Sequence, residues 1–415
     1  MRAAGLVAAI AATVAWSGDA GAQDLSLAQV ERGRYLATAA NCLGCHTNVE
    51  EDGIPWSGGR EMETPFGVII TPNITPDDAT GLGLWTRGEF RRALREGVRR
   101  DGAHLYPAFP YPYFTKMPDG DIDAIYDYLR TIEPVHAERV PEEELPAPLR
   151  IRTAVLGWKT LHFEEGPLEP DPERSDAWNR GRYLVDGPAH CGACHTPKTL
   201  TGGDDTDNYL RGGVLENWLA PNIRGGDNGG LAAWSEDEIV EFLGTGRANH
   251  TIAMSRMGEV VALSTQHLAE EDLRAMATYL KSIDDEPRDV AGEQEEEVST
   301  AGAALFFDNC AACHVSDGSG VANMFARLDG SNKVNSEDPT TIIRIVLEGA
   351  RAEPTNAYPN PFAMPSFAWQ LTDEQVADLL SYVRSAWGNS APPVEASEVA
   401  AMRDELFGGT RGEAR

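Results

Sequence analysis

The sequence predicts an all-α protein of three tandem domains, each built on the same pattern. A lead-in of the form R-G-R-Y-L occupies residues 32–36 and again 180–184, and a looser version, A-G-A-A-L, occupies 301–305. Each lead-in is followed by a cysteine motif and, much later, by apolar residues at helical spacing. Because self-similarity along a chain marks repeated structural units, we expect three helical domains in succession.

All six cysteines of the chain lie in three motifs of the form C-x-x-C-H. This motif is the attachment site of c-type haem: the two thiols form thioethers with the porphyrin, and the histidine coordinates the iron. A lone C-x-x-C would equally suit a redox dithiol or half a zinc site. Three copies with no thiol left over favour three covalently bound haems c. The predicted residues are Cys42, Cys45 and His46, Cys191, Cys194 and His195, and Cys310, Cys313 and His314.

Two helices are expected to cross in each domain, one before the cysteine motif and one well after it. The later helices are predicted over 122–132, 273–283 and 376–383. The third opens with Thr372 and Gln375, a capping-box pair. A glycine in each lead-in should let a tyrosine of the later helix pack closely over it. The pairs are Gly33 and Tyr128, Gly181 and Tyr279, and Gly302 and Tyr382. This is the pattern of the class I cytochrome c fold.

Composition divides the chain at two connectors. Residues 138–150 are rich in Pro and Glu, and residues 284–298 form an acidic run, so both are expected to be solvated linkers. The predicted units are a signal peptide over 1–22, domains over 23–137, 150–284 and 298–390, and a C-terminal tail over 391–415 that packs or docks.

The N-terminus has the features of a secretory signal. Arg2 precedes an apolar run, and the small residues 20–22 predict cleavage before Gln23. The run is short for a membrane span, although an uncleaved anchor is the alternative. We therefore expect a periplasmic protein, either free or attached to the outer face of the inner membrane.

The formal net charge of −30 excludes some classes of partner. So negative a surface argues against binding to nucleic acid and against direct attraction to anionic lipid. It is compatible with docking on a basic patch of a protein partner, and also with a salt-adapted surface.

A haem that only carries electrons benefits from a filled sixth position, and a methionine thioether there favours Fe(II). Met364 precedes the last predicted helix of the third domain and is the predicted ligand there. In the second domain Met257 and Met254 compete, and Met257 is preferred because its spacing to Tyr279 is nearer to that of the third domain.

The first domain departs from this pattern, because Phe109 occupies the position equivalent to Met364. The nearby sulfur is that of Met117, which we predict as the ligand, delivered by a proline-stiffened loop. The alternatives are ligation by His104, an open site, and the more remote Met62. Met117 also suits the role of a core residue at a helix start.

Backbone carbonyls are expected to hold the axial histidines. Pro72 and Pro221 follow the first two motifs at matched places, and the carbonyl of either could accept the Nδ1–H of the histidine, which fixes its tautomer. The third domain offers the segment 326–328 instead, in which Arg327 is a candidate partner of a haem propionate.

Together with the export signal, the C-x-x-C-H motifs, the R-G-x-Y-L lead-ins, the segment 71–76 and Trp178-Asn-Arg-Gly, the chain resembles a known family. This family is the triheme cytochrome c subunit of membrane-associated periplasmic dehydrogenases. The resemblance implies a large catalytic partner subunit of flavin, quinone or molybdenum type. It also implies electron transfer through three haems to ubiquinone or a terminal oxidase.

Two other functions compete with an electron-transfer subunit of an oxidoreductase complex. A peroxidase-like multihaem enzyme requires an open distal site, which only the first haem offers. A free periplasmic shuttle would have no obligatory partner, but three fused haems favour a fixed conduit. The sequence assigns no catalytic residue.

Overall fold

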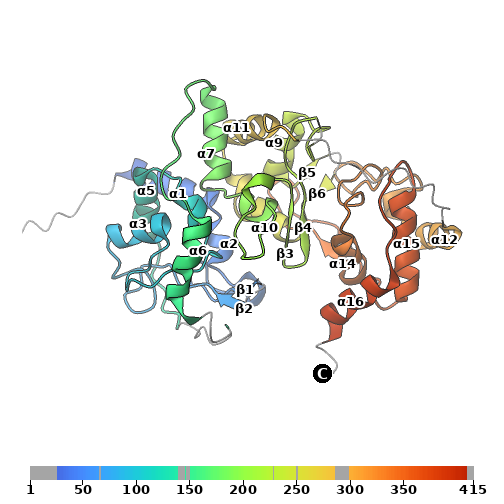
Figure 1. The fold of residues 1–415 in the computed structure, drawn as a ribbon, viewed down its shortest axis with the longest axis horizontal. Coiled ribbons are helices and arrows are strands. Elements are labelled where there is room, and N and C mark those ends of the chain that lie inside the picture. The colour runs from blue at the N-terminus through green and yellow to red at the C-terminus, as the bar shows by residue number, and fades with distance from the viewer. Residues whose placement is uncertain are drawn as a thin grey trace, which may run out of the picture.

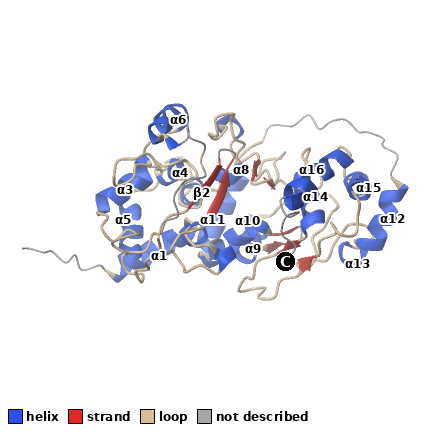
Figure 2. Ribbon diagram, turned by 90° about the horizontal axis from the view of Figure 1, so that it is seen from below, coloured by secondary structure: helices blue, strands red, loops and turns tan. Residues whose placement is uncertain are grey.

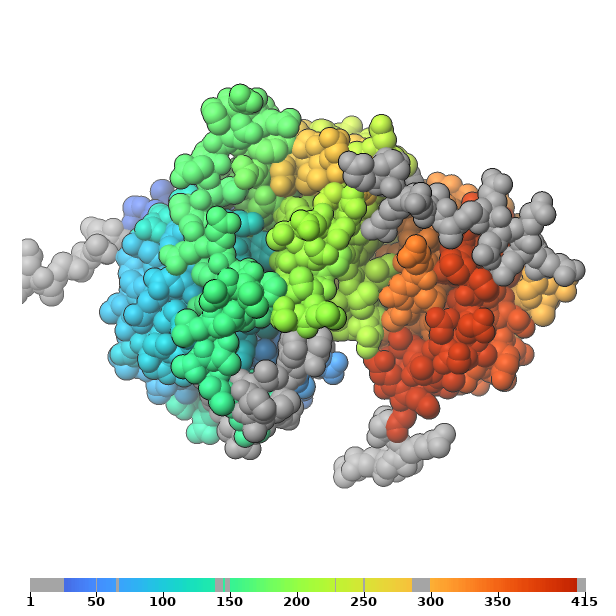
Figure 3. Space-filling model, viewed as in Figure 1, coloured from blue at the N-terminus to red at the C-terminus, as the bar shows by residue number. Residues whose placement is uncertain are grey.

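The structure places the three repeats one after another across the molecule. This computed structural model describes residues 26–64, 67–138, 145, 150–227, 229–248, 251–285 and 299–408. In Figure 1 the first repeat (26–138, blue) lies at one end, the second (169–285) in the middle and the third (299–408, red) at the other end. The surface shows the same order of colours (Figure 3). The predicted signal peptide lies outside the described residues.

The first repeat begins with the helix that carries the R-G-R-Y-L lead-in. Its helices are α1 (Leu27–Ala39), α2 (Cys42–Cys45), α3 (Arg87–Glu96), α4 (Tyr111–Phe114) and α5 (Asp119–Leu129), and its strands are β1 (Glu61–Thr64) and β2 (Gly67–Ile70). Ser26 caps α1, and Thr86 with Glu89 forms a capping box at α3, so each helix starts at a residue that satisfies its free N–H groups.

The second and third repeats also begin with a lead-in helix and a short helical turn, but they differ from the first repeat in their hairpins. The second contains α7 (Asp176–Asp186), α8 (Gly192–His195), β3 (Gly213–Leu215), β4 (Trp218–Ala220), α9 (Glu236–Thr245), β5 (Arg247–Ala248), β6 (Thr251–Ile252), α10 (Ser255–Leu263) and α11 (Glu270–Lys281). The third contains α12 (Thr300–Asn309), α13 (Ala311–His314), α14 (Thr340–Glu348), β7 (Ala350–Arg351), β8 (Ala363–Met364), α15 (Asp373–Ser385) and α16 (Ala396–Phe407). The predicted capping box of Thr372 and Gln375 is confirmed at α15.

The described chain is mostly helical, and its strands form four two-stranded antiparallel hairpins (Figure 2). The pairs are β1–β2, β3–β4, β5–β6 and β7–β8. Sequence analysis did not predict these hairpins, because none has enough residues to show an alternating pattern. Each repeat has its own hydrophobic core, centred on α1 and α5, on α7 and α11, and on α12, α14 and α15.

The predicted helix crossing is confirmed in all three repeats. A Cβ atom on Gly33 would lie 1.8 Å from the Ala124 carbonyl oxygen, and one on Gly181 would lie 1.9 Å from that of Ala275. In the third repeat, a Cβ on Gly302 would lie 2.1 Å from the oxygen of Asp378. The later helix therefore rests directly on the glycine. The matched tyrosines lie over it, with Cβ atoms within 2.9 Å of the added atom.

The segment that follows the first connector lies over the first repeat, although sequence analysis assigned it to the second domain (Figure 1). The helix α6 (Val155–His162) places Lys159 Nζ 3.0 Å from the Gly97 carbonyl oxygen and the Trp158 ring edge-on to Tyr111. The His162 ring hydrogen-bonds to Thr201 of the second repeat. This helix thus contacts both repeats.

The C-terminal tail packs on the third repeat. Val399 and Met402 of α16 are buried in the same core as α14 and α15. Arg403 forms an ion pair of 2.6 Å with Asp373 at the start of α15. Among the described residues, no helix combines the length and the apolar character that crossing a membrane requires.

Candidate haem sites

Each C-x-x-C-H motif forms a short helical turn directly after the lead-in helix of its repeat. α2, α8 and α13 contain these turns, and they follow α1, α7 and α12 after a few residues. Each motif directly follows a lead-in helix, and that helix is held by the later helix that packs on its glycine. The crossing therefore also fixes the position of the motif. The six cysteines form no disulfide with one another.

The backbone after each motif returns and holds the histidine. Pro72 O lies 2.7 Å from Nδ1 of His46, and Pro221 O lies 2.7 Å from Nδ1 of His195. The third repeat uses the Ala326 carbonyl, 2.8 Å from Nδ1 of His314. A carbonyl only accepts, so Nδ1 carries the proton and Nε2 keeps its lone pair for a metal. The predicted carbonyl partners are therefore confirmed.

A glycine in each returning segment makes this arrangement possible, and sequence analysis missed all three. The N–H groups of Gly58, Gly212 and Gly320 donate to the carbonyls of the three histidines, at 2.9, 2.8 and 3.0 Å. Their φ angles are 76°, 97° and 66°, which disfavour any residue with a Cβ. They follow their histidines by 12, 17 and 6 residues, so no constant spacing marked them in the sequence.

The protonation states at the motifs suit a thioether-bound haem better than a redox dithiol. Burial lowers the pKa of His46, His195 and His314, so these imidazoles are neutral and able to coordinate at neutral pH. Burial also raises the pKa of Cys42 and Cys191 to about 12. A redox dithiol needs a thiolate, which so high a pKa disfavours.

A cavity beside the first motif has room for a large planar group. Its volume is about 1030 Å³, at the upper end of the usual size of ligand pockets. Cys42, Cys45 and His46 form part of its wall, and apolar residues of α3 and α5 such as Leu94 and Ile125 form another part. Thiols, a metal-ligating imidazole and an apolar wall around one cavity are what a covalent haem requires.

Comparison with known proteins agrees with this geometry. The sequence profile of cytochrome c matches residues 30–133, 179–284 and 299–387. The chain belongs to the cytochrome c family. It is 40% identical over 420 residues to the cytochrome c subunit of the quinone alcohol dehydrogenase of Gluconobacter oxydans, with 96% of this chain and 87% of that protein covered.

Two further relatives serve different dehydrogenases. This cytochrome is 38% identical over 413 residues to the gluconate 2-dehydrogenase cytochrome c subunit of Pantoea cypripedii, covering 93% of this chain and 92% of that one. It is 36% identical over 405 residues to the fructose dehydrogenase cytochrome subunit of Gluconobacter japonicus, covering 90% and 82%. The resemblance to cytochrome c subunits of dehydrogenases is thereby confirmed.

The two methionines predicted for the second and third haems lie beside the cores of their repeats. Met364 is in β8, opposite Ala350, and is partly buried against the third core. Met257 is in the first turn of α10 and packs against the second core, whereas Met254 is the residue that precedes this helix. Both predicted ligands are thus partly accessible, as a side chain that borders a haem must be.

Met117 of the first repeat, in contrast, is not accessible. Its side chain is fully buried in the core of the repeat, and the part of the cavity wall that the structure describes includes Phe109 but not Met117. A side chain that coordinates iron has to border the cavity that holds the haem. The structure therefore gives the predicted ligation by Met117 no support.

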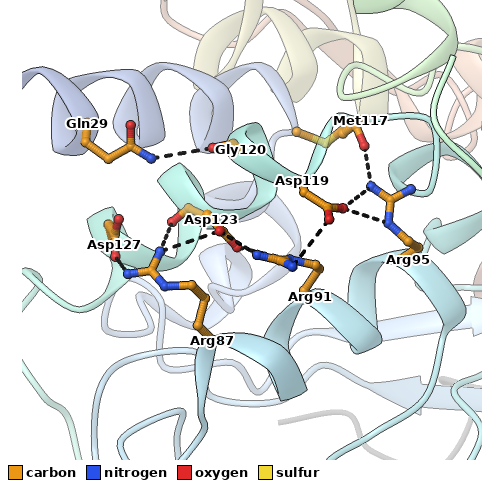
Figure 4. A network of polar contacts seen from close by, with 9 residues as sticks. All are labelled: Gln29, Arg87, Arg91, Arg95, Met117, Asp119, Gly120, Asp123 and Asp127. Carbon is orange, nitrogen blue, oxygen red and sulfur yellow. Dashed lines mark hydrogen bonds and ion pairs between the residues drawn. The ribbon is translucent and has the colours of Figure 1, made fainter. Parts of the chain in front are cut away.

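An ion-pair ladder explains why the loop around Met117 is held in place (Figure 4). Successive turns of α3 present arginines to successive turns of the antiparallel α5. Arg87 pairs with Asp127, Arg91 with Asp123 and Arg95 with Asp119, at 2.6, 2.6 and 2.7 Å. Arg95 also donates to the backbone carbonyls of Thr115 and Met117, at 2.7 Å each. These bonds fix the chain between α4 and α5.

The alternative ligands in the first repeat are placed as follows. His104 is not among the described residues that line the cavity, and Lys159 of α6 lies 3.1 Å from its Nδ1. Met62 does line the cavity, but it belongs to the hairpin that leads into Pro72. The carbonyl that holds His46 belongs to Pro72, two residues after this hairpin.

Two further placements concern charged residues. Arg327, proposed as a partner of a propionate, forms an ion pair with Asp329 of its own loop.

Arg60, which sequence analysis did not single out, is buried and donates to the Gly44 carbonyl inside the first motif. The second terminal nitrogen of its guanidinium group pairs with Glu259 of α10 at 2.7 Å. A buried charge pair thus joins the first motif to the second repeat.

Proposed function

We propose that this cytochrome carries three haems in three tandem class I domains and passes electrons from the catalytic subunit of a dehydrogenase complex to an acceptor. One observation carries the proposal: the same arrangement of two cysteines, a histidine and a carbonyl partner recurs in all three repeats. A chain with a single redox site would need it once. The relatives that serve alcohol, gluconate and fructose dehydrogenases support a partner of this kind.

In this proposal the residues divide into three roles. The six cysteines would hold the porphyrins, and His46, His195 and His314 would each bind one iron. Met257 and Met364 would be the further iron ligands of the second and third haems. The haem supplies a one-electron couple, and the protein sets its potential through the ligands and through burial. The carbonyls of Pro72, Pro221 and Ala326 keep each imidazole in the metal-binding tautomer.

We further propose that the protein works in the periplasm after loss of residues 1–22, with ubiquinone or a terminal oxidase as the acceptor. The apolar N-terminal run and the need to attach haem to free thiols support export. The net charge of −30 supports docking on a basic surface of the catalytic subunit.

Substrate-driven reduction of the complex tests the proposal. The cytochrome is purified together with the catalytic subunit of its dehydrogenase, and the substrate of that subunit is added in the absence of oxygen. We expect the haem absorption to change to that of the reduced form, to an extent that accounts for three haems per chain. Adding ubiquinone should then reoxidise it. A cytochrome that purifies alone and stays oxidised would contradict the proposal.

A second candidate function has one observation in its favour. Phe109 lines the cavity of the first repeat, and in the sequence it occupies the position equivalent to Met364, which supports a first haem without a methionine ligand. An open site suits a peroxidase-like enzyme. Carbon monoxide separates the two functions: the wild-type protein binds it at one haem if the site is open. Peroxidase turnover that is lost together with this binding would favour the enzyme. A free shuttle is excluded if the cytochrome purifies with its catalytic subunit.

A further inference from the structure

The lead-in R-G-R-Y-L contains a residue that haem binding and helix crossing do not explain. The glycine serves the crossing, and the first arginine binds an aspartate of the crossing helix, but the tyrosine of each copy reaches the other repeat. In the structure these residues form two clusters at the boundary between the first and second repeats. Each cluster consists of an arginine and an aspartate from one repeat and a tyrosine from the other.

The first cluster is centred on Asp272 of α11. Arg180 of α7, in the same repeat, binds both carboxylate oxygens, at 2.8 and 2.6 Å. Tyr35 of α1, in the first repeat, donates its hydroxyl to the same carboxylate at 2.5 Å. The Tyr35 oxygen in turn accepts the N–H of Ala269 at 3.1 Å. A side chain of the first repeat thus completes an ion pair of the second.

The second cluster repeats this arrangement with the two repeats exchanged. Arg32 of α1 donates to Asp121 of α5 at 2.6 Å, and Tyr183 of α7 donates its hydroxyl to the other oxygen of that carboxylate. Asp121 is almost fully buried. The Tyr183 ring packs against the core of the first repeat, as the Tyr35 ring does against that of the second. Each repeat therefore supplies a tyrosine to the ion pair of the other, as two subunits related by a twofold axis do.

The third repeat provides an internal comparison, because it lacks all three residues. Its lead-in has Ala301 and Ala304 where the other copies have the arginine and the tyrosine, and both alanines are exposed. Gln375 occupies the position of the aspartate and caps its own helix instead. Haem attachment and helix crossing persist in this repeat without the cluster. The cluster consequently serves the pairing of the first two repeats.

We propose that Tyr35 and Tyr183 are positioning residues, which fix the first two haem sites against each other for electron transfer between them. The helices that carry them, α1 and α7, lead directly into the cysteine motifs, so a shift of either helix moves a haem. Hydrogen bonds between a tyrosine and a charged carboxylate are stronger than neutral ones and are directional. This inference rests on the proposed function, because it takes both motifs to carry haem.

A second contact holds the motifs themselves together. Tyr113 of α4 donates to Asp204 of the second repeat, and its hydroxyl lies where a side chain on Gly192 would place its Cβ, at 2.6 Å. Gly192 is inside the second C-x-x-C-H motif. The first repeat therefore touches the second motif directly, and the clusters fix the angle at which it does so.

The test compares the full-length cytochrome with a Y35F/Y183F variant, which removes both hydroxyls and keeps both rings. Pulsed electron paramagnetic resonance on the oxidised protein measures the distances between haems, and injection of a single electron measures its equilibration among them. We expect a broader distance distribution between the first two haems and a several-fold slower equilibration between them. The distance from the second haem to the third should stay unchanged. Y126F, which removes a hydroxyl bonded within the first repeat, is the control.

The pattern of coupling between substitutions gives an independent check. Y35F should be coupled to D272N and additive with D121N, whereas Y183F should be coupled to D121N and additive with D272N. The single variants serve if the double variant fails to take up haem. Distances and rates equal to those of the wild type would overturn the inference and leave the proposed function standing. A wild-type protein without electron exchange between its haems would instead contradict the proposed function.

Discussion

The histidines of the three motifs show how single backbone atoms prepare a metal site. A carbonyl at 2.7 or 2.8 Å from Nδ1 fixes the proton there in every repeat, although the residue that supplies it changes from proline to alanine in the third. The identity of that side chain is thus of little consequence, since the backbone does the work. The glycine that turns the chain back is the residue that cannot be exchanged.

Replacing Met364 by histidine should lower the reduction potential of the third haem and leave the other two nearly unchanged. The thioether favours the reduced iron, and imidazole removes that preference. Each tenfold change in the relative affinity for Fe(II) and Fe(III) is about 59 mV for one electron. We expect a shift on the order of a hundred millivolts in a potentiometric titration. If no component moves, Met364 is a packing residue.

Replacing Met117 by leucine shows whether this residue is an iron ligand or a core residue. Because its side chain is fully buried in the core, we expect M117L to keep the parent spectrum and to cost less than about 1.5 kcal/mol of stability. The contrasting variant is F109M, which places a thioether where the third repeat has Met364. It should prevent carbon monoxide from binding to the first haem. Loss of a methionine–iron charge-transfer band in M117L would restore Met117 as the ligand.

At the scale of elements, the crossing of two helices on a glycine is the strongest constraint in each repeat. Gly181→Ala would place a methyl group 1.9 Å from the Ala275 carbonyl oxygen, and backbone cannot yield as a flexible side chain does. We expect a loss of about 3 kcal/mol or more in thermal unfolding. Gly157→Ala in α6, where no atom lies within 4 Å, is the control and should stabilise slightly. Equal effects of the two substitutions would contradict the crossing.

The elements that could be predicted are those whose signal is local. The apolar residues around Ile122, Leu273 and Val376 recur at helical spacing, which predicted these helices. The Pro72 carbonyl was predicted as a histidine partner because the same short segment recurs in the second repeat. The hairpins are too short for a period, and the contacts of α6 depend on a surface that forms only when the first repeat has folded. Phe109 was visible in the sequence, but the burial of Met117 required the structure.

At the scale of the whole molecule, charged and polar contacts between the repeats hold the haem sites in one arrangement. Arg60 of the first repeat pairs with Glu259, and Arg256 joins Glu259 to Glu216, at 2.7, 3.0 and 2.6 Å. Arg344 of the third repeat then donates to the Glu216 carbonyl at 2.8 Å. This chain of contacts reaches from the first motif to the third repeat.

Replacing Arg60 by alanine should therefore destabilise the protein well beyond the usual effect of a lost ion pair. The pair is largely buried, and removing Arg60 leaves Glu259 paired with Arg256 alone and the Gly44 carbonyl without this donor, at a cost of about 2 kcal/mol. Arg274→Ala, which removes an exposed arginine paired with Asp237, should cost less than about 1 kcal/mol. Thermal unfolding of the two variants measures the difference, and similar melting temperatures would argue against a structural role of the chain of contacts.

The most direct test of the central claim, three haems on one chain, is the intact mass of the purified mature protein. Three complete motifs use all six thiols, so we expect the mass of residues 23–415 plus three haems and no thiol that reacts after unfolding. A mass with two haems, or a titratable free thiol in the unfolded protein, would contradict the account.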